Sequence, residues 1–321
     1  MITEDLRVDS DTPGIRLFVR NKRRKDVTAF APERTLLFVH GSTYPAECAF
    51  DLALDGLSWM DYVAGRGFDV YLMDVRGYGA SDRPTEMNRP PAESPPLVRT
   101  AMAVRDVASV VEFIVARRGI GALNLCGWSW GTTLMGAYTA SHNHRVCKLV
   151  LLAPQWVRSG PSQSDPGGAI GAYRAVSLPD ARVRWMRGVP EDKQAGLLPR
   201  DWFDRWAQAA FATDPWGAAQ SPPVIRAPNG TVQDSREFWA AGKPFYDPGK
   251  IGVPVLQVHA DWDQDLPLDM ARAYFAQLTG APYRRWVEIG EGTHSVLLEK
   301  NRMQVFEAVQ AFLQENFAPA T

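Results

Sequence analysis

Short apolar runs bounded by glycine or proline recur along the chain from residue 35 onward. They occupy residues 35–40 (TLLFVH), 70–75 (VYLMDV), 123–126, 149–153 (LVLLA), 253–259 (VPVLQVH) and 286–289. Continuous runs of this kind indicate strands buried on both faces, as in a parallel sheet. Between them, apolar residues repeat at a 3.6-residue spacing, which predicts helices at residues 98–117, 268–278 and 302–317. The alternation predicts an α/β fold with a mostly parallel, doubly wound sheet and helices on both faces.

One long segment interrupts this alternation. Residues 157–250 are rich in Pro, Gly, Trp and Arg and contain helical stretches at 180–187 and 201–211, but no buried-strand run. The sheet pattern resumes at Val253. We therefore expect a core formed by residues 1–156 and 251–321, with residues 157–250 inserted as a helical cap.

Charge gives no indication of a nucleic acid or membrane partner. The chain has 35 Lys and Arg against 36 Asp and Glu, so no strong field attracts a polyanion. The basic stretch NKRRK lies within residues 14–25, a predicted β-ribbon, where we expect it to form the solvated tip of a turn. No apolar run approaches the roughly 20 residues that span a bilayer.

Cysteine usage points to a reducing compartment. Cys48, Cys126 and Cys147 form neither a disulfide framework nor a metal-ligand spacing. The N-terminal segment MITEDLRVDSD lacks the basic and apolar regions of a secretory signal. We expect a cytoplasmic protein with buried, inert thiols; the sequence does not indicate its oligomeric state.

The sharpest chemical motif is Gly127-Trp128-Ser129-Trp130-Gly131, between a predicted strand and a predicted helix. A strand-to-helix turn this sharp needs glycines beside the serine, and it exposes the hydroxyl near a helix N-terminus. The motif therefore predicts Ser129 as a nucleophile.

A serine nucleophile needs a histidine base and a carboxylate to orient it. Of the five histidines, His294 lies in a loop after the last predicted strand, whereas the others fall in the early motif, at a helix end or inside a strand. Three aspartates follow the strand at 253–259, namely Asp261, Asp263 and Asp265. All three lie at the carboxyl end of the sheet, where open α/β folds place their sites.

Together these motifs resemble the α/β-hydrolase superfamily. The resemblance rests on the elbow, Gly292-Thr293-His294, His40-Gly41 and the loop Asp74-Val75-Arg76-Gly77-Tyr78-Gly79-Ala80-Ser81, and it covers about residues 15–156 and 251–321. It implies that Asp263, four residues before Pro267, is the triad acid. It also implies an oxyanion hole formed by the backbone N–H groups of Ser42 and Trp130.

The loop after His40-Gly41 departs from the family pattern, because its proline comes four residues after the glycine instead of two. Thr43 could therefore replace Ser42 as the N–H donor. Relatives that open epoxides or remove halide carry aspartate at the elbow, so Ser129 argues for acyl transfer to water. Such a reaction needs no metal and no organic cofactor.

Tryptophans surround the predicted site. We expect Thr43, Trp128, Trp156 and Trp262 to contact the substrate, and the cap to contribute further tryptophans. These rings predict a small or medium ester with an aromatic or bulky apolar group. The Trp-Ser-Trp elbow is also similar to that of bacterial hydrolases of phthalate monoesters. Three alternatives stay open: a proline iminopeptidase-like aminopeptidase, a carbon–carbon bond hydrolase of aromatic ring-cleavage products, and a non-catalytic ligand receptor.

Overall fold

An eight-stranded sheet forms the centre of the computed structural model, which describes residues 1–199 and 201–317. The strand order is β1-β2-β4-β3-β5-β6-β9-β10. β1 pairs antiparallel with β2, and β2 antiparallel with β4; the six strands from β4 to β10 run parallel. The bounds are β1 (Ile2–Asp9), β2 (Arg16–Arg23), β3 (Thr35–Val39), β4 (Asp69–Met73), β5 (Leu123–Trp128), β6 (Val146–Leu152), β9 (Val255–Ala260) and β10 (Arg284–Ile289). The predicted α/β fold with a mostly parallel sheet is confirmed.

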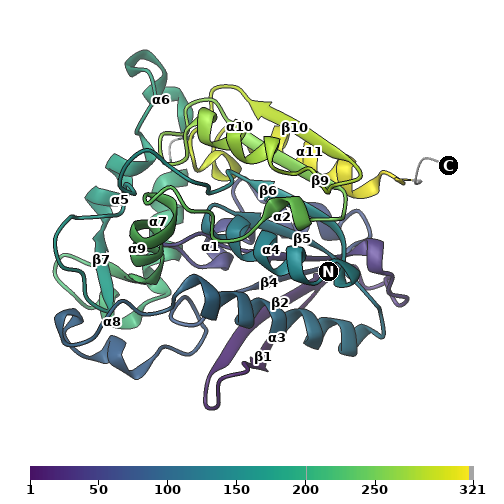
Figure 1. Ribbon diagram of the computed structural model, residues 1–321, viewed down its shortest axis with the longest axis horizontal. Coiled ribbons are helices and arrows are strands. Elements are labelled where there is room, and N and C mark those ends of the chain that lie inside the picture. Colours follow the sequence, from purple (N-terminus) through teal and green to yellow (C-terminus); the bar gives the residue numbers. More distant parts are fainter. Residues whose placement is uncertain (200, 318–321) are drawn as a thin grey trace.

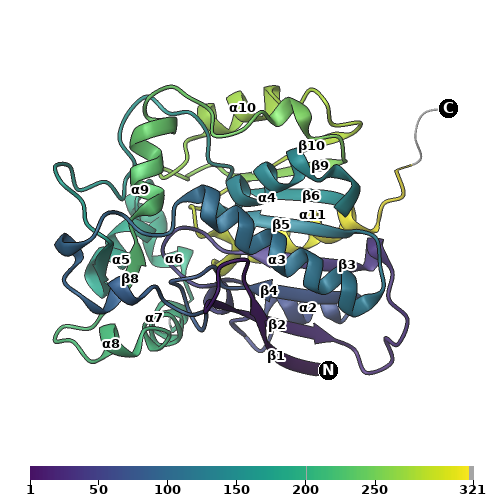
Figure 2. The ribbon, with the colours of Figure 1, turned by 60° about the horizontal axis from the view of Figure 1, so that its bottom comes forward.

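Helices cover both faces of this sheet (Figures 1 and 2). α3 (Thr100–Arg118) and α4 (Trp130–Ser141) pack together on one face, whereas α2 (Trp59–Ala64) and α11 (Arg302–Gln314) pack together on the other. α1 (Ala46–Phe50) contacts β3 and β4, and α10 (Leu268–Ala276) contacts β9. None of the helices within residues 1–199 and 201–317 is long and apolar enough to cross a membrane.

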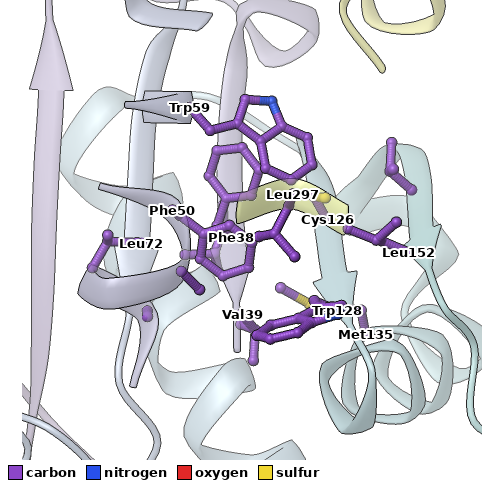
Figure 3. Packing of buried hydrophobic residues seen from close by; sticks show 14 of the residues in the cluster. Phe38, Val39, Phe50, Trp59, Leu72, Cys126, Trp128, Met135, Leu152 and Leu297 are labelled. Carbon is purple, nitrogen blue, oxygen red and sulfur yellow. The ribbon is translucent and has the colours of Figure 1, made fainter. Parts of the chain in front are cut away.

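Aromatic side chains from the sheet and from the α2–α11 face form much of the core. Phe38 on β3 stacks on Phe50 with 4.7 Å between ring centroids, and Trp59 stacks on Phe306 at 4.9 Å. Figure 3 shows Phe38, Phe50 and Trp59 together, with Trp128 at the end of β5 next to Val39. All residues of β3, β4 and β5 are buried, which explains why their sequences are mostly apolar.

The inserted segment lies at one end of the sheet in both views (Figures 1 and 2). It contains more than the predicted helices, because β7 (Tyr173–Ser177) and β8 (Val224–Pro228) form a separate antiparallel pair. The loop that precedes α3 binds this pair through backbone bonds from Leu97 N to Ala172 O and from Gly230 N to Leu97 O. The helices are α5 (Leu178–Trp185), α6 (Gln194–Leu197), α7 (Trp202–Ala212), α8 (Pro215–Ala218) and α9 (Gly230–Asp234), followed by a π-helical turn at Ser235–Trp239.

The N-terminal ribbon corrects one sequence prediction. Its turn lies between β1 and β2, so Asn21 and Lys22 of the basic stretch are within β2 and not at a tip. Asn21 is fully buried and donates to Asp69, and Lys22 is paired with Asp51 and Asp61. The sequence analysis misplaced both residues because their acidic partners are distant in sequence.

Candidate active site

Ser129 occupies the turn between β5 and α4 in a strained backbone conformation. Its φ is 57° and its ψ is −123°, outside the regions that L-residues normally adopt. The turn is fixed by a backbone bond of 2.9 Å from Ser129 N to Leu152 O, and by the Thr132 hydroxyl, which donates to Ser129 O. The serine is 8% exposed and lines a small cavity.

The two glycines of the motif are required by close backbone contacts. A Cβ on Gly127 would overlap the carbonyl of Gly131, and a Cβ on Gly131 would overlap the carbonyl of Val39. Gly41 lies against the serine itself, since a Cβ there would be 3.0 Å from Ser129 Cβ. The turn at residues 127–131 therefore packs closely against the end of β3 and the loop that follows it.

His294 and Asp263 form a hydrogen-bonded pair at the ends of β10 and β9. His294 Nδ1 lies 2.8 Å from Asp263 Oδ2, while Asp263 Oδ1 accepts the amides of Asp265 and Leu266 at 2.9 Å each. Asp263 is 2% exposed. Burial on its own lowers the pKa of an imidazole, but the Asp263 carboxylate outweighs burial and holds the pKa of His294 above its usual value of 6.5.

The other two aspartates have different partners. Asp261 is exposed and accepts the Gly292 amide at 3.3 Å. Asp265 is buried and binds Arg184 Nε at 2.6 Å and Arg187 at 3.4 Å. Burial raises the pKa of Asp265, but the adjacent Arg184 reverses this effect and holds that pKa below its usual range. Of the three candidates, the structure therefore joins only Asp263 to His294 by a hydrogen bond.

The loop after β3 carries Ser42 and Thr43, the two candidates for one of the oxyanion N–H donors. Ser42 O accepts from the Tyr78 hydroxyl at 3.0 Å and from Arg174 at 2.8 Å, and the Thr43 hydroxyl accepts from Arg174 at 2.9 Å. His40 anchors the loop, because its Nε2 accepts Val75 N at 3.0 Å and its Nδ1 lies 2.6 Å from Gly41 O. Burial lowers the pKa of His40 to about 4, so it stays neutral.

Trp130 begins α4, where the first N–H groups have no acceptor within the helix. Its indole is buried and donates to the Thr100 hydroxyl at 3.0 Å, so its side chain is tied to α3. Trp130 is the residue after Ser129, so its backbone N–H is next to the nucleophile in the chain. The oxyanion roles of Trp130 and of Ser42 or Thr43 stay predictions.

A cavity of about 30 Å³, which has room for one or two waters, lies over Ser129. Of the predicted substrate-contacting residues, Thr43 and Trp128 line it together with Ser129, His294 and Ser42. Trp156 and Trp262 are not among its lining residues. Trp156 packs edge-on against Tyr246 and Tyr274, and Trp262 donates its backbone N–H to Gly292 and meets Gly188 of the cap.

Helix α5 supplies cavity residues, and one of them, Trp185, is among the cap tryptophans that the sequence analysis expected near the site. Ala181, Arg184 and Trp185 share one face of this helix and line the cavity. A signal existed: Ser177 and Asp180 form a capping box that marks the start of the helix. From that start, the spacing of residues 181, 184 and 185 defines one side of the helix.

Glu299 is a further residue near the site that the sequence analysis missed. It is fully buried after the His294 loop and accepts three donors, which are Thr293 N at 2.9 Å, the Thr293 hydroxyl, and Trp185 Nε1 at 2.8 Å. Burial raises the pKa of Glu299 to about 7, although these hydrogen bonds favour the ionised form. Glu299 thus ties the cap helix to the loop that carries His294.

No group of three or more His, Cys, Asp or Glu residues within residues 1–199 and 201–317 could hold a metal ion. The candidate site consists of the Ser129 hydroxyl, the His294 imidazole and the Asp263 carboxylate.

This arrangement agrees with the comparison of the chain with known protein families. A family model described as the alpha/beta hydrolase fold matches residues 35–301, and the chain belongs to that family. The comparison with curated protein sequences found no match.

Solved structures with the same fold cover nearly the whole chain. A serine hydrolase involved in carbazole degradation has a TM-score of 0.64 and 17% identity, over 97% of this chain and 99% of the other. A serine hydrolase from the polyaromatic-hydrocarbon-degrading Cycloclasticus zankles has a TM-score of 0.62 and 16% identity, over 97% and 98%. An epoxide hydrolase from Vigna radiata has a TM-score of 0.59 and 15% identity, over 97% and 98%. At these identities the likeness shows the fold and does not choose between reactions.

Proposed function

We propose that the protein is a serine carboxylic-ester hydrolase that works through an acyl-enzyme. The observation that carries this proposal is that Ser129, on its strained turn, lines one cavity with His294, whose Nδ1 is bonded to the buried Asp263. Aspartate holds the imidazole in one tautomer, with Nε2 free to accept a proton. Serine at the elbow favours acyl transfer over epoxide opening.

In the proposed reaction, Ser129 Oγ attacks the ester carbonyl carbon while His294 accepts the hydroxyl proton. The N–H groups of Trp130 and of Ser42 or Thr43 stabilise the negative oxygen of the tetrahedral intermediate. The intermediate collapses, His294 protonates the departing alcohol, and the acyl group stays on Ser129. A water activated by His294 then releases the acid and restores the serine.

An aminopeptidase is less well supported. Such an enzyme needs a free carboxylate to bind the substrate amine, and the one acid among the residues that line the cavity is Asp265. Its charge is already neutralised by Arg184 and Arg187.

Trp128, Trp185 and Tyr44 line the cavity and support an ester with an aromatic or bulky apolar group. Replacing Trp185 by alanine should lower the kcat/KM ratio of ethyl benzoate to ethyl acetate by about 10-fold, because the ring contributes roughly 1–3 kcal/mol of apolar contact. Trp185→Phe keeps a ring but loses the hydrogen bond to Glu299, and should keep most of the ratio. Trp216, which is 47% exposed, provides the control Trp216→Ala. An unchanged ratio in folded Trp185→Ala would contradict the aromatic preference, and no ester hydrolysis by the wild type would contradict the proposed reaction.

The activity should depend on pH through His294. The base must be neutral, and its pKa lies above 6.5. We therefore expect kcat/KM for a neutral ester to rise with pH through a midpoint above 6.5. The same midpoint should appear in the imidazole NMR shifts of Ser129→Ala, and adding Asp263→Asn should move it to lower pH. A kinetic midpoint that differs from the imidazole midpoint of His294 would show that His294 is not the titrating base.

A further inference from the structure

The loop between β3 and α1, which carries Ser42 and Thr43, is held in place mainly by side chains. Outside helices and strands, no backbone-to-backbone hydrogen bond among the described residues involves either of the two. From the core, the His40 imidazole lies 2.6 Å from Gly41 O, and the Tyr78 hydroxyl donates to Ser42 O at 3.0 Å. Neither of these bonds reaches Thr43, so the core alone leaves part of the β3–α1 loop without an anchor.

The cap supplies the remaining contacts through two arginines. Arg174 on β7 donates through Nη2 to Ser42 O at 2.8 Å and to the Thr43 hydroxyl at 2.9 Å. Arg184 on α5 donates to the same hydroxyl at 3.2 Å. Thr43 is 4% exposed, so water does not readily replace these donors. The loop beside Ser129 is therefore anchored from two sides, by the core and by the cap.

The positive charge of Arg174 is not neutralised by a carboxylate among the described residues. Its Nη1 donates to Pro228 O at 2.9 Å, so every strong hydrogen bond of this guanidinium goes to an uncharged acceptor. Arg184, in contrast, is paired with Asp265. Burial lowers the pKa of Arg174, yet an arginine stays protonated at neutral pH. Its charge therefore acts on the loop near which the negative oxygen of the intermediate is expected.

The bond to Ser42 O controls the direction of a candidate oxyanion donor. Ser42 O and Thr43 N–H belong to one planar peptide unit, so a bond to the oxygen fixes the orientation of the N–H. A donor on the carbonyl also polarises the peptide and strengthens its N–H as a donor. The Ser42 N–H belongs to the preceding peptide unit, whose oxygen lies against His40, and it shares Ser42 with the unit that Arg174 holds. An error of about 1 Å in such a geometry costs roughly 100-fold in rate.

We propose that Arg174 is a positioning residue through which the cap holds the β3–α1 loop in the geometry that binds the oxyanion. This inference rests on the proposed ester hydrolysis and gives the cap a part in the chemical step as well as in substrate selection. The tetrahedral oxygen forms with every ester, so the effect of Arg174 should not depend on the size of the substrate. Trp185 differs in this respect, because its loss is expected to change the preference between esters.

The kinetic test uses ethyl acetate and ethyl benzoate. Arg174→Met should lower kcat by about 30-fold for both esters, change each KM by less than about 3-fold, and leave the ratio of the two kcat/KM values unchanged. Arg174→Lys keeps the charge and can reach one of the two acceptors, so it should recover about 3-fold or more of the lost kcat. Arg205→Met is the matched control, because Arg205 on α7 also joins the cap to the core, but at Ala53 O. Its kcat should stay within about 2-fold of wild type.

An inhibitor that forms an oxyanion separates positioning from a general structural role. The Ser129 oxygen adds to the carbonyl carbon of 1,1,1-trifluoro-3-phenylpropan-2-one, its proton passes to His294, and the former carbonyl oxygen becomes negative. The Ki of this ketone should rise by about 30-fold in Arg174→Met, in step with the fall in kcat/KM. By calorimetry, ethyl benzoate should bind Ser129→Ala and Ser129→Ala/Arg174→Met with affinities within about 3-fold, because no oxyanion forms there.

An unchanged Ki, or a loss of kcat/KM for one ester and not for the other, would overturn the positioning role while ester hydrolysis stands. If Arg174→Met does not fold, Arg174→Lys takes its place in both measurements, with an expected rise in Ki of about 5-fold. A wild-type protein that neither hydrolyses the esters nor forms the ketone adduct would instead overturn the proposed function.

Discussion

Ester hydrolysis should fall by about 10⁵-fold or more when Ser129 is replaced by alanine, because the attacking oxygen is removed. Ser129 is nearly buried, and its backbone, not its hydroxyl, makes the hydrogen bonds that fix the turn. The melting temperature should therefore stay within about 2 °C of wild type. A fluorophosphonate should label wild type once and leave the alanine variant unlabelled, as intact mass would show. Full activity of the alanine variant would end the serine-hydrolase proposal.

Ser129→Gly is the matched variant for stability. Both substitutions remove the hydroxyl, but glycine relieves the positive φ of 57°. The relief is worth roughly 1–3 kcal/mol, and the greater freedom of unfolded glycine offsets about 0.5–1 kcal/mol of it. We expect Ser129→Gly to unfold at higher denaturant concentration than Ser129→Ala. The reverse order would show that the turn is not strained.

Asp263→Asn should lower kcat by about 10⁴-fold, because an amide at this position favours the wrong imidazole tautomer. The two backbone amides that bind Asp263 Oδ1 would still find an acceptor in the asparagine carbonyl, so the fold should persist. Circular dichroism and thermal unfolding of the purified variant would check this.

Asp261→Asn and Asp265→Asn are the controls for that measurement. Asp261 is exposed and bonded only weakly to Gly292 N, so its variant should stay within about 3-fold of wild type. Asp265→Asn should lower the melting temperature, since Arg184 and Arg187 lose their acid. If the asparagine at 265 or 261 costs more kcat than the one at 263, then the orienting carboxylate has been misassigned.

Local sequence was sufficient to predict the strands that are buried on both faces of the sheet. β3, β5 and β9 are mostly apolar and fully buried. Gly127 and Gly131 occupy positions where two backbone segments are in close contact. The alternation placed the elbow, the three aspartates and His294 in loops after strands at one edge of the sheet, but the choice of Asp263 came from the resemblance to the α/β-hydrolase superfamily.

Features that depend on distant partners could not be predicted in this way. β7 and β8 pair although about 50 residues separate them in the sequence. Most residues of β7 are only half-buried, and neither strand shows a clear hydrophobic pattern. Lys22 of β2 was misread because its partners Asp51 and Asp61 are distant in sequence. Which tryptophans reach the cavity depends on how the cap sits on the core, which spacing alone does not define.

The size of the cavity over Ser129 has a kinetic consequence. About 30 Å³ has room for one or two waters, so we expect a bulky ester to bind with displacement of a side chain or of α5. Glu299 links Trp185 of α5 to the loop of His294, so movement of this helix strains the position of the base. We therefore expect opening for substrate entry to disturb the alignment of His294. For bulky esters, we expect the rate at which the cap closes again, and not the acyl transfer itself, to limit turnover.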